Sequence, residues 1–176
     1  MGTWIREKGA ITEAPDRPVL AVLCREGVQD KLCRHYLANG ERWRRLRGCP
    51  YWVYLDTFYV MTNWDSTLEI ARFNLETKEQ VLFNRKAMGS IIHQTKELHR
   101  DASATLSLQE TIRLHQESLR QFKRGLGRQG KSPARKALFV RLESVAMQLD
   151  YYAGTAATIL EQQKNLISLV SVLLCY

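Results

Sequence analysis

The clearest pattern of hydrophobic and polar positions is an apolar repeat near the C-terminus. Its members recur at spacings of four and three residues over about five heptads, and Gln163 is the only polar one. Such a pattern is typical of a long helix that packs lengthwise against other helices, so we predict a helix over 133–174. Its helix-packing seam is Leu138, Leu142, Val145, Leu149, Tyr152, Ala156, Ile159, Gln163, Leu166, Val170 and Leu173.

Weaker helical periodicity predicts three further helices, over about 18–38, 51–83 and 91–125. Residues 1–17 show no periodicity and contain glycine and proline, so we expect an irregular N-terminal lead-in. Residues 39–50 are expected to form a basic connector.

Start and stop signals support these limits. Asp16 is placed to cap the first helix, and Asn39 and Gly40 to end it. The glycine-rich segment 125–132 predicts a loop, in which Ser132 caps a last helix that begins at Pro133.

Together these elements predict an all-α fold, with residues 18–176 forming one helical domain. Long helices joined by short loops pair antiparallel. We therefore expect an elongated antiparallel bundle of three to four long helices.

The charge of the chain is concentrated in short segments. The net charge is +8, and residues 120–141 hold eight basic and no acidic side chains. These residues, and the RWRRLR stretch at 42–47, could bind phosphate groups of nucleic acid or anionic lipid. Neither forms a recognised nucleic-acid-reading motif, so we do not expect nucleic acid as a partner. The candidate anion-binding residues are Arg120, Lys123, Arg124, Arg128, Lys131, Arg135 and Lys136.

Motifs for catalysis or metal binding are missing from the sequence. It contains neither HExxH nor the Glu-x-x-His pairs of di-iron bundles. The stretch GLGRQGKS at 125–132 matches a phosphate-binding loop in letters, but no buried strand precedes it and Pro133 follows it. A flexible basic loop between helices explains this stretch better. We therefore expect no enzyme, no metal site and no cofactor.

The cysteines and the last residues bear on the location of the protein. Four cysteines without a CxxC pair are typical of reduced thiols in an intracellular protein. The apolar run 166–176 is eleven residues long, whereas a membrane span needs about 20. Because the chain stops inside this run, we expect it to be truncated before a membrane segment.

Several phrases occur in an order that resembles the soluble helical region of fungal CorA-like magnesium transporters. They are WDSTLEI at 64–70, KELHR at 96–100, QETIRLH at 109–115, LDYYAGT at 149–155 and QKNLISLV at 163–170. The resemblance covers about residues 50–174. The Gly-Met-Asn signature and both membrane helices of the family are absent from the sequence. The resemblance implies a cytoplasmic stalk without its pore and a pentameric family assembly. Magnesium is implied by this resemblance alone, and we otherwise expect no cofactor.

Three hypotheses follow. The first is a non-enzymatic region like the cytoplasmic stalk of a CorA-like divalent-cation transporter. It is membrane-associated if a longer product carries membrane helices, and otherwise cytoplasmic. The second is an interaction module that joins a second copy or a partner helix through the 138–173 seam. The third is an anionic-surface binder that uses residues 120–141.

Overall fold

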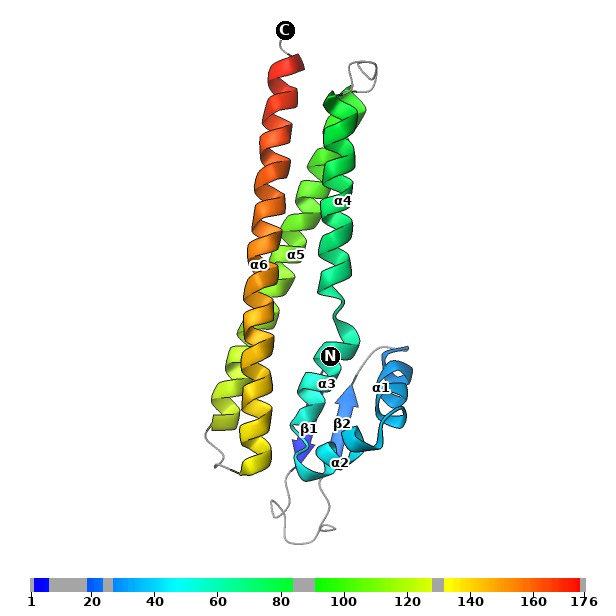
Figure 1. The fold of residues 1–176 in the computed structure, drawn as a ribbon, viewed down its shortest axis with the longest axis vertical. Helices are drawn as coiled ribbons and strands as arrows, with labels where there is room; N and C mark the ends of the chain where they lie inside the picture. Colours follow the sequence, from blue (N-terminus) through cyan, green and yellow to red (C-terminus); the bar gives the residue numbers. More distant parts are fainter. Residues whose placement is uncertain (1, 7–18, 24–26, 84–90, 128–131, 175–176) are drawn as a thin grey trace. The chain divides into compact units, whose positions relative to one another are not determined.

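The computed structural model describes residues 2–6, 19–23, 27–83, 91–127 and 132–174, and most of these residues are helical (Figure 1). The described elements are two short strands and six helices. In chain order they are β1 (Gly2–Arg6), β2 (Val19–Leu23), α1 (Val28–Leu37), α2 (Gly40–Gly48), α3 (Trp52–Met61), α4 (Trp64–Phe83), α5 (Ile91–Gly127) and α6 (Pro133–Leu174).

The chain groups into two compact units, where the sequence predicts a single helical domain. The first unit consists of Met1–Asn63 and Gly127–Leu142. The second unit consists of Trp64–Leu126 and Glu143–Tyr176. The helix α6 contributes to both units, and α4 and nearly all of α5 belong to the second.

The first unit contains a two-stranded antiparallel sheet in which β1 pairs with β2, from Gly2 opposite Leu23 to Arg6 opposite Val19. The sequence-based prediction of an irregular lead-in over 1–17 is therefore wrong for β1. The prediction of helix is wrong for β2. Both strands are rich in β-prone residues, but a strand gains its hydrogen bonds only from a distant partner, which local periodicity does not reveal.

Within the range 18–38, which the sequence predicts to be one helix, the described helix is α1, over Val28–Leu37. Gly27, at its N-terminus, has a φ of 83°, a left-handed conformation that glycine adopts without steric cost. This glycine separates α1 from the preceding strand. Asp16, the expected cap, lies outside the described residues.

The segment predicted as a basic connector instead contains the helix α2. The side chain of Asn39 accepts a hydrogen bond from the Glu41 amide at 2.9 Å, which is the geometry of an N-cap. Asn39 therefore starts a helix here, whereas the sequence analysis assigned it to the end of the previous one.

The helix predicted over 51–83 is divided into α3 and α4. Thr62 adopts an extended backbone conformation, and its hydroxyl donates a hydrogen bond of 2.7 Å to the carbonyl of Phe58. A side chain that occupies a helix carbonyl in this way competes with continuation of the helix. The sequence offers no glycine or proline at this point, so the interruption is not apparent from turn residues.

The two longest helices follow the sequence pattern closely. The helix α5 continues to Gly127, and α6 covers the range 133–174 given by the apolar repeat. Ser132 caps α6 as expected, because its hydroxyl oxygen accepts a hydrogen bond of 3.3 Å from the Arg135 amide.

In the second unit, α4 and α5 run antiparallel. Lys78 forms an ion pair with Asp101, and the rings of Trp64 and His115 lie 5.5 Å apart. From the first contact to the second, the residue on α4 changes from 78 to 64, whereas the residue on α5 changes from 101 to 115. Only antiparallel helices give this relation.

The helices α5 and α6 are also antiparallel. Gln116 donates to Asp150 at 2.7 Å, and Lys123 pairs with Glu143 at 2.5 Å, so both contacts shift by seven residues in opposite directions. The Tyr152 hydroxyl donates to Asp65 on α4 at 2.9 Å. Asp65 thus links α4 to α6 through a hydrogen bond between the two helices.

The seam of α6 faces inward at every described position. The side chains from Leu138 to Val170 in the repeat are buried, and Leu173 lies outside the residues whose side chains are described. Gln163 is 2% exposed, and its carbonyl oxygen has no hydrogen-bond partner among the described residues. This amide is the one polar interruption of the repeat.

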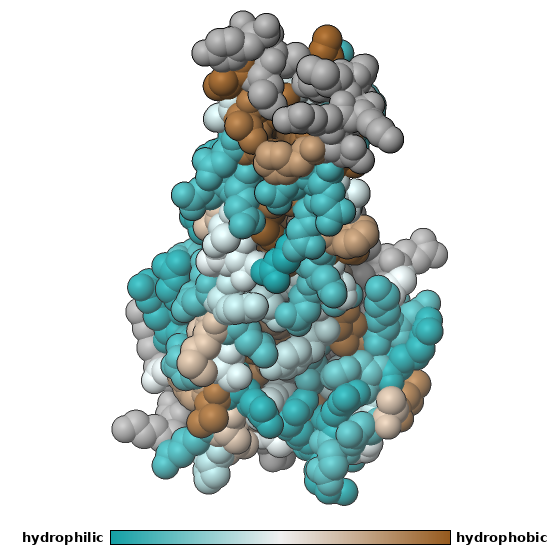
Figure 2. All heavy atoms as spheres, turned by 45° about the horizontal axis from the view of Figure 1, so that its top comes forward, coloured by the Kyte–Doolittle hydropathy of each residue, from teal (hydrophilic) through white to brown (hydrophobic). Residues whose placement is uncertain are grey.

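None of the described helices combines the length and the apolar character that crossing a bilayer requires. On the face drawn in Figure 2, hydrophilic residues cover most of the surface, and hydrophobic residues gather beside grey ones at one end. The exposed large apolar side chains of the second unit include Phe83, Ile92, Leu169 and Val172.

Replacing Gln163 with leucine should stabilise the protein. The leucine removes a buried carbonyl that lacks a partner, a defect that costs about 1–3 kcal/mol. We expect the midpoint of urea unfolding to rise. Gln162→Leu, an exposed neighbour, should leave the midpoint nearly unchanged. A loss of stability in Gln163→Leu would show that the amide is satisfied in solution.

The second unit should lose stability at mildly acidic pH. Burial lowers the pKa of His115 below its usual value, because the charged imidazolium is poorly solvated there. The unfolded chain therefore binds a proton that the folded chain does not, and stability falls as the pH drops below about 6.5. Urea unfolding at neutral and acidic pH measures this loss. His115→Gln should reduce it, whereas His99→Gln, at an exposed position, should not.

Candidate functional site

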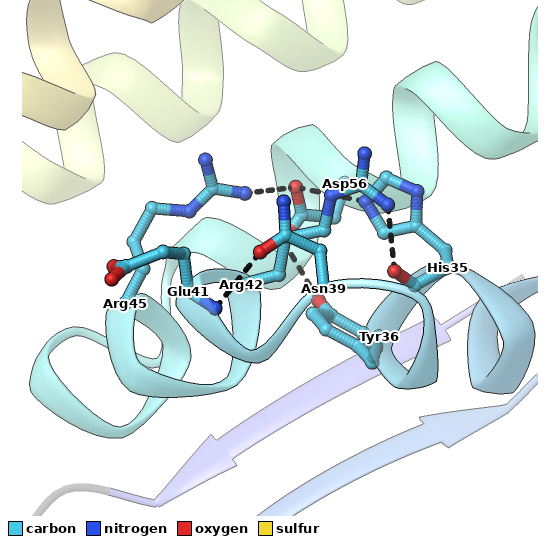
Figure 3. A network of polar contacts seen from close by, with 7 residues as sticks. All are labelled: His35, Tyr36, Asn39, Glu41, Arg42, Arg45 and Asp56. Atoms are coloured by element: carbon cyan, nitrogen blue, oxygen red, sulfur yellow. Dashed lines mark hydrogen bonds and ion pairs between the residues drawn. The ribbon is translucent and has the colours of Figure 1, made fainter.

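The first unit brings polar side chains from two short helices around a buried carboxylate on a third (Figure 3). Asp56 lies in α3, whose sequence WVYLDTFYVM is otherwise almost entirely apolar. The helix α1 contributes His35 and Tyr36. The helix α2 contributes Arg42 and Arg45, which are three residues apart and thus share a helix face.

Asp56 is 2% exposed and has three partners. Its Oδ2 accepts a hydrogen bond of 3.0 Å from the Tyr36 hydroxyl. Its Oδ1 accepts one of 2.5 Å from Arg45 and lies 3.4 Å from the Nε2 atom of His35. These contacts compensate the cost of burying the charge and tie α1, α2 and α3 together.

The two arginines of α2 are held in place. Arg42 donates a hydrogen bond of 2.7 Å to the backbone carbonyl of His35. The guanidinium of Arg45 lies 4.0 Å above the ring of Trp52, a cation–π contact in addition to its ion pair with Asp56. Both guanidinium groups therefore have a fixed orientation.

The environment of Tyr36 favours its neutral form. Burial raises the pKa of the Tyr36 hydroxyl well above its usual range, and the negative charge of Asp56 raises it further. Tyr36 therefore stays a hydrogen-bond donor to Asp56 over the physiological pH range.

A pocket of about 320 Å³ opens beside this cluster. It is lined by His35, Arg42, Arg45, Trp52, Leu55, Asp56, Tyr59 and Arg141. A second pocket, of about 490 Å³, shares Arg42, Arg45 and Trp52 with the first. Three guanidinium groups and a single carboxylate line the first pocket, so its chemistry suits an anion. We call it the arginine pocket.

None of the predicted anion-binding residues that the structure describes lines this pocket. Arg120 pairs with Glu117 at 2.8 Å, and Lys123 pairs with Glu143. Arg135 stacks over the ring of Tyr51 at 5.3 Å. Arg124 and Lys136 are exposed, and Arg128 and Lys131 lie outside the described residues.

The basic stretches noted in the sequence contain some residues of the arginine pocket, but the sequence did not indicate the pocket itself. Arg42 and Arg45 belong to the basic stretch at 42–47, and Arg141 ends the basic run of 120–141. The signal that could have led to the site is Asp56, a carboxylate in an apolar helix, since such a group needs cationic or donor partners.

The described residues contain no group of three or more histidine, cysteine or carboxylate side chains that could hold a metal ion. Cys33 is exposed and Cys49 is buried. Cys24 and Cys175 lie outside the described residues.

Replacing Asp56 with alanine should destabilise the protein by about 2 kcal/mol, since it leaves Arg45 without its buried partner. The change in the free energy of unfolding can be measured by urea titration. Glu41→Ala removes an ion pair with Arg44 in which both side chains are exposed, so it should cost less than about 1 kcal/mol. Equal losses in the two variants would contradict a central role for Asp56.

Comparison with protein-family models finds no match, and comparisons with curated proteins and with solved structures find none either. The likeness to CorA-like transporters therefore rests on the short sequence phrases alone. The arginine pocket has to be interpreted from its own chemistry.

Proposed function

We propose that the chain is a non-enzymatic helical region like the cytoplasmic part of a CorA-like divalent-cation transporter. In this proposal the second unit is the stalk, built as an elongated antiparallel helical bundle. The phrases that carry the resemblance support it, because they fall on the helices of this unit. WDSTLEI opens α4, QETIRLH lies in α5, and QKNLISLV lies in α6.

The observation that carries the proposal is the apolar end of the second unit. Phe83 ends α4, Ile92 lies at the start of α5, and Val172 lies near the end of α6, so the antiparallel pairing puts them at the same end. All three side chains are exposed. In the family that the chain resembles, the last helix runs from this end toward the membrane. An exposed apolar end suits that position, since such surface is stabilised by a nonpolar environment.

The hypothesis that a second copy or a partner helix binds through the α6 seam has weaker support than the stalk proposal. The seam residues from Val145 to Val170 are buried within a single chain. A partner helix could reach them only if the packing of the second unit opened. Self-association through another surface stays compatible with the stalk proposal, since the family forms pentamers.

The hypothesis that residues 120–141 bind an anionic surface also has weaker support. Two of its cations, Arg120 and Lys123, are neutralised by carboxylates of the same unit. Magnesium enters the proposal only through the resemblance, and we assign no residue to it.

The stalk proposal predicts a longer gene product. Sequencing of the transcript beyond codon 176 should reveal two apolar segments of about 20 residues each, because a pore of this family needs two membrane helices. An immunoblot of membrane fractions, with an antibody against the second unit, should then detect a larger polypeptide. A reading frame that closes without apolar segments would contradict the transporter version and leave the described fold unaffected.

A further inference from the structure

We propose that the arginine pocket of the first unit binds a phosphate monoester. This site is separate from the stalk proposal, since every residue that lines it belongs to the first unit. The proposal rests on charge, on free donors and on the shape of the two adjoining pockets.

The charge of the pocket matches a phosphate monoester. Arg42, Arg45 and Arg141 contribute three positive charges, and Asp56 contributes one negative charge. The three arginines and the one carboxylate together leave two positive charges. A phosphate monoester carries about −1.5 to −2 at neutral pH, so it neutralises this excess. The planar guanidinium groups donate paired hydrogen bonds that suit phosphate oxygens.

The arginines keep donors available for such a ligand. Arg45 donates to Asp56 through its Nη2 atom, and its other terminal nitrogen, Nη1, has no hydrogen-bond partner among the described residues. Arg141 is exposed and forms no hydrogen bond or ion pair with any described residue. A phosphate group in the pocket would give both side chains the acceptors that they lack.

The site is also organised before a ligand arrives. Arg42 is fixed by the carbonyl of His35, and Arg45 is fixed by Asp56 and by the ring of Trp52 (Figure 3). Asp56 therefore orients an arginine and does not itself contact the ligand. Because these side chains are already ordered, binding loses little conformational entropy.

The adjoining pocket indicates an ester and not free phosphate alone. It shares the two α2 arginines and Trp52 with the arginine pocket, and Ala134 and Ala137 add apolar surface to it. A ligand with its phosphate on the arginines could extend an apolar or aromatic group over this surface. The combined volume is in the range of small-molecule sites.

Phenyl phosphate combines a phosphate group with an aromatic ring, so it is the probe for this site. It is titrated into the whole chain by calorimetry at about 150 mM salt, because this salt concentration screens diffuse charge attraction. We expect saturable binding at one site. Arg141→Gln should weaken it about tenfold, the effect of losing one charge-assisted hydrogen bond. Lys136→Gln removes the same charge from an exposed position on α6 that lines neither pocket, and should leave the affinity unchanged.

Vesicles distinguish a soluble ligand from a lipid headgroup. Binding of phenyl phosphate that depends on Arg141 supports the pocket with a soluble ester as its source. Arg141-dependent binding to phosphatidic acid vesicles, without binding to phenyl phosphate, supports the same pocket with a lipid as its source. No binding to either probe, equal losses in Arg141→Gln and Lys136→Gln, or equal binding to phosphatidylserine vesicles would overturn the proposal.

Discussion

The second unit depends on burial of one continuous face of α6. An apolar residue at every third or fourth position forms a stripe that a single helix cannot shield from water, so other helices have to cover it. The helices α4 and α5 cover it, and polar contacts between helices then fix their register: Lys78 with Asp101, Gln116 with Asp150, and Tyr152 with Asp65. Burial supplies the stabilisation of this unit, and the polar pairs select one alignment.

The first unit depends on a different constraint, the burial of a single carboxylate. Asp56 would be strongly unfavourable in an apolar helix without compensation. Tyr36 and Arg45 provide that compensation, and in doing so they hold α1 and α2 against α3. The same contacts orient an arginine toward a pocket that also contains Arg141. The Asp56 carboxylate, which the first unit needs for stability, thus also orients Arg45 at the pocket that we propose binds an anion.

The two proposals concern different parts of the molecule and different chemistry. The stalk proposal rests on the apolar end of the second unit and on a sequence resemblance, and it involves no catalysis. The phosphate proposal rests on the arginine pocket alone. A transporter-like stalk in the second unit and an anion site in the first unit are compatible, since the two proposals use different residues.

The long helices could be predicted from the sequence alone. The apolar repeat predicted α6 over its full range, and periodicity placed α5 within two residues of its C-terminal end, because both signals arise from neighbours within one element. The start of α6 was equally readable, since the bond from Arg135 to Ser132 is local. Three features became visible only in the fold. Residues 2–6 and 19–23 pair as strands, and Thr62 interrupts the second predicted helix. Side chains of α1 and α2 gather around Asp56 of α3. This difference arises from the distance along the chain over which the contacts act. Helix periodicity is a property of adjacent turns and can be read locally. Strand pairs, buried ion pairs and pockets join residues that are distant in the chain, so these contacts form only when the chain folds.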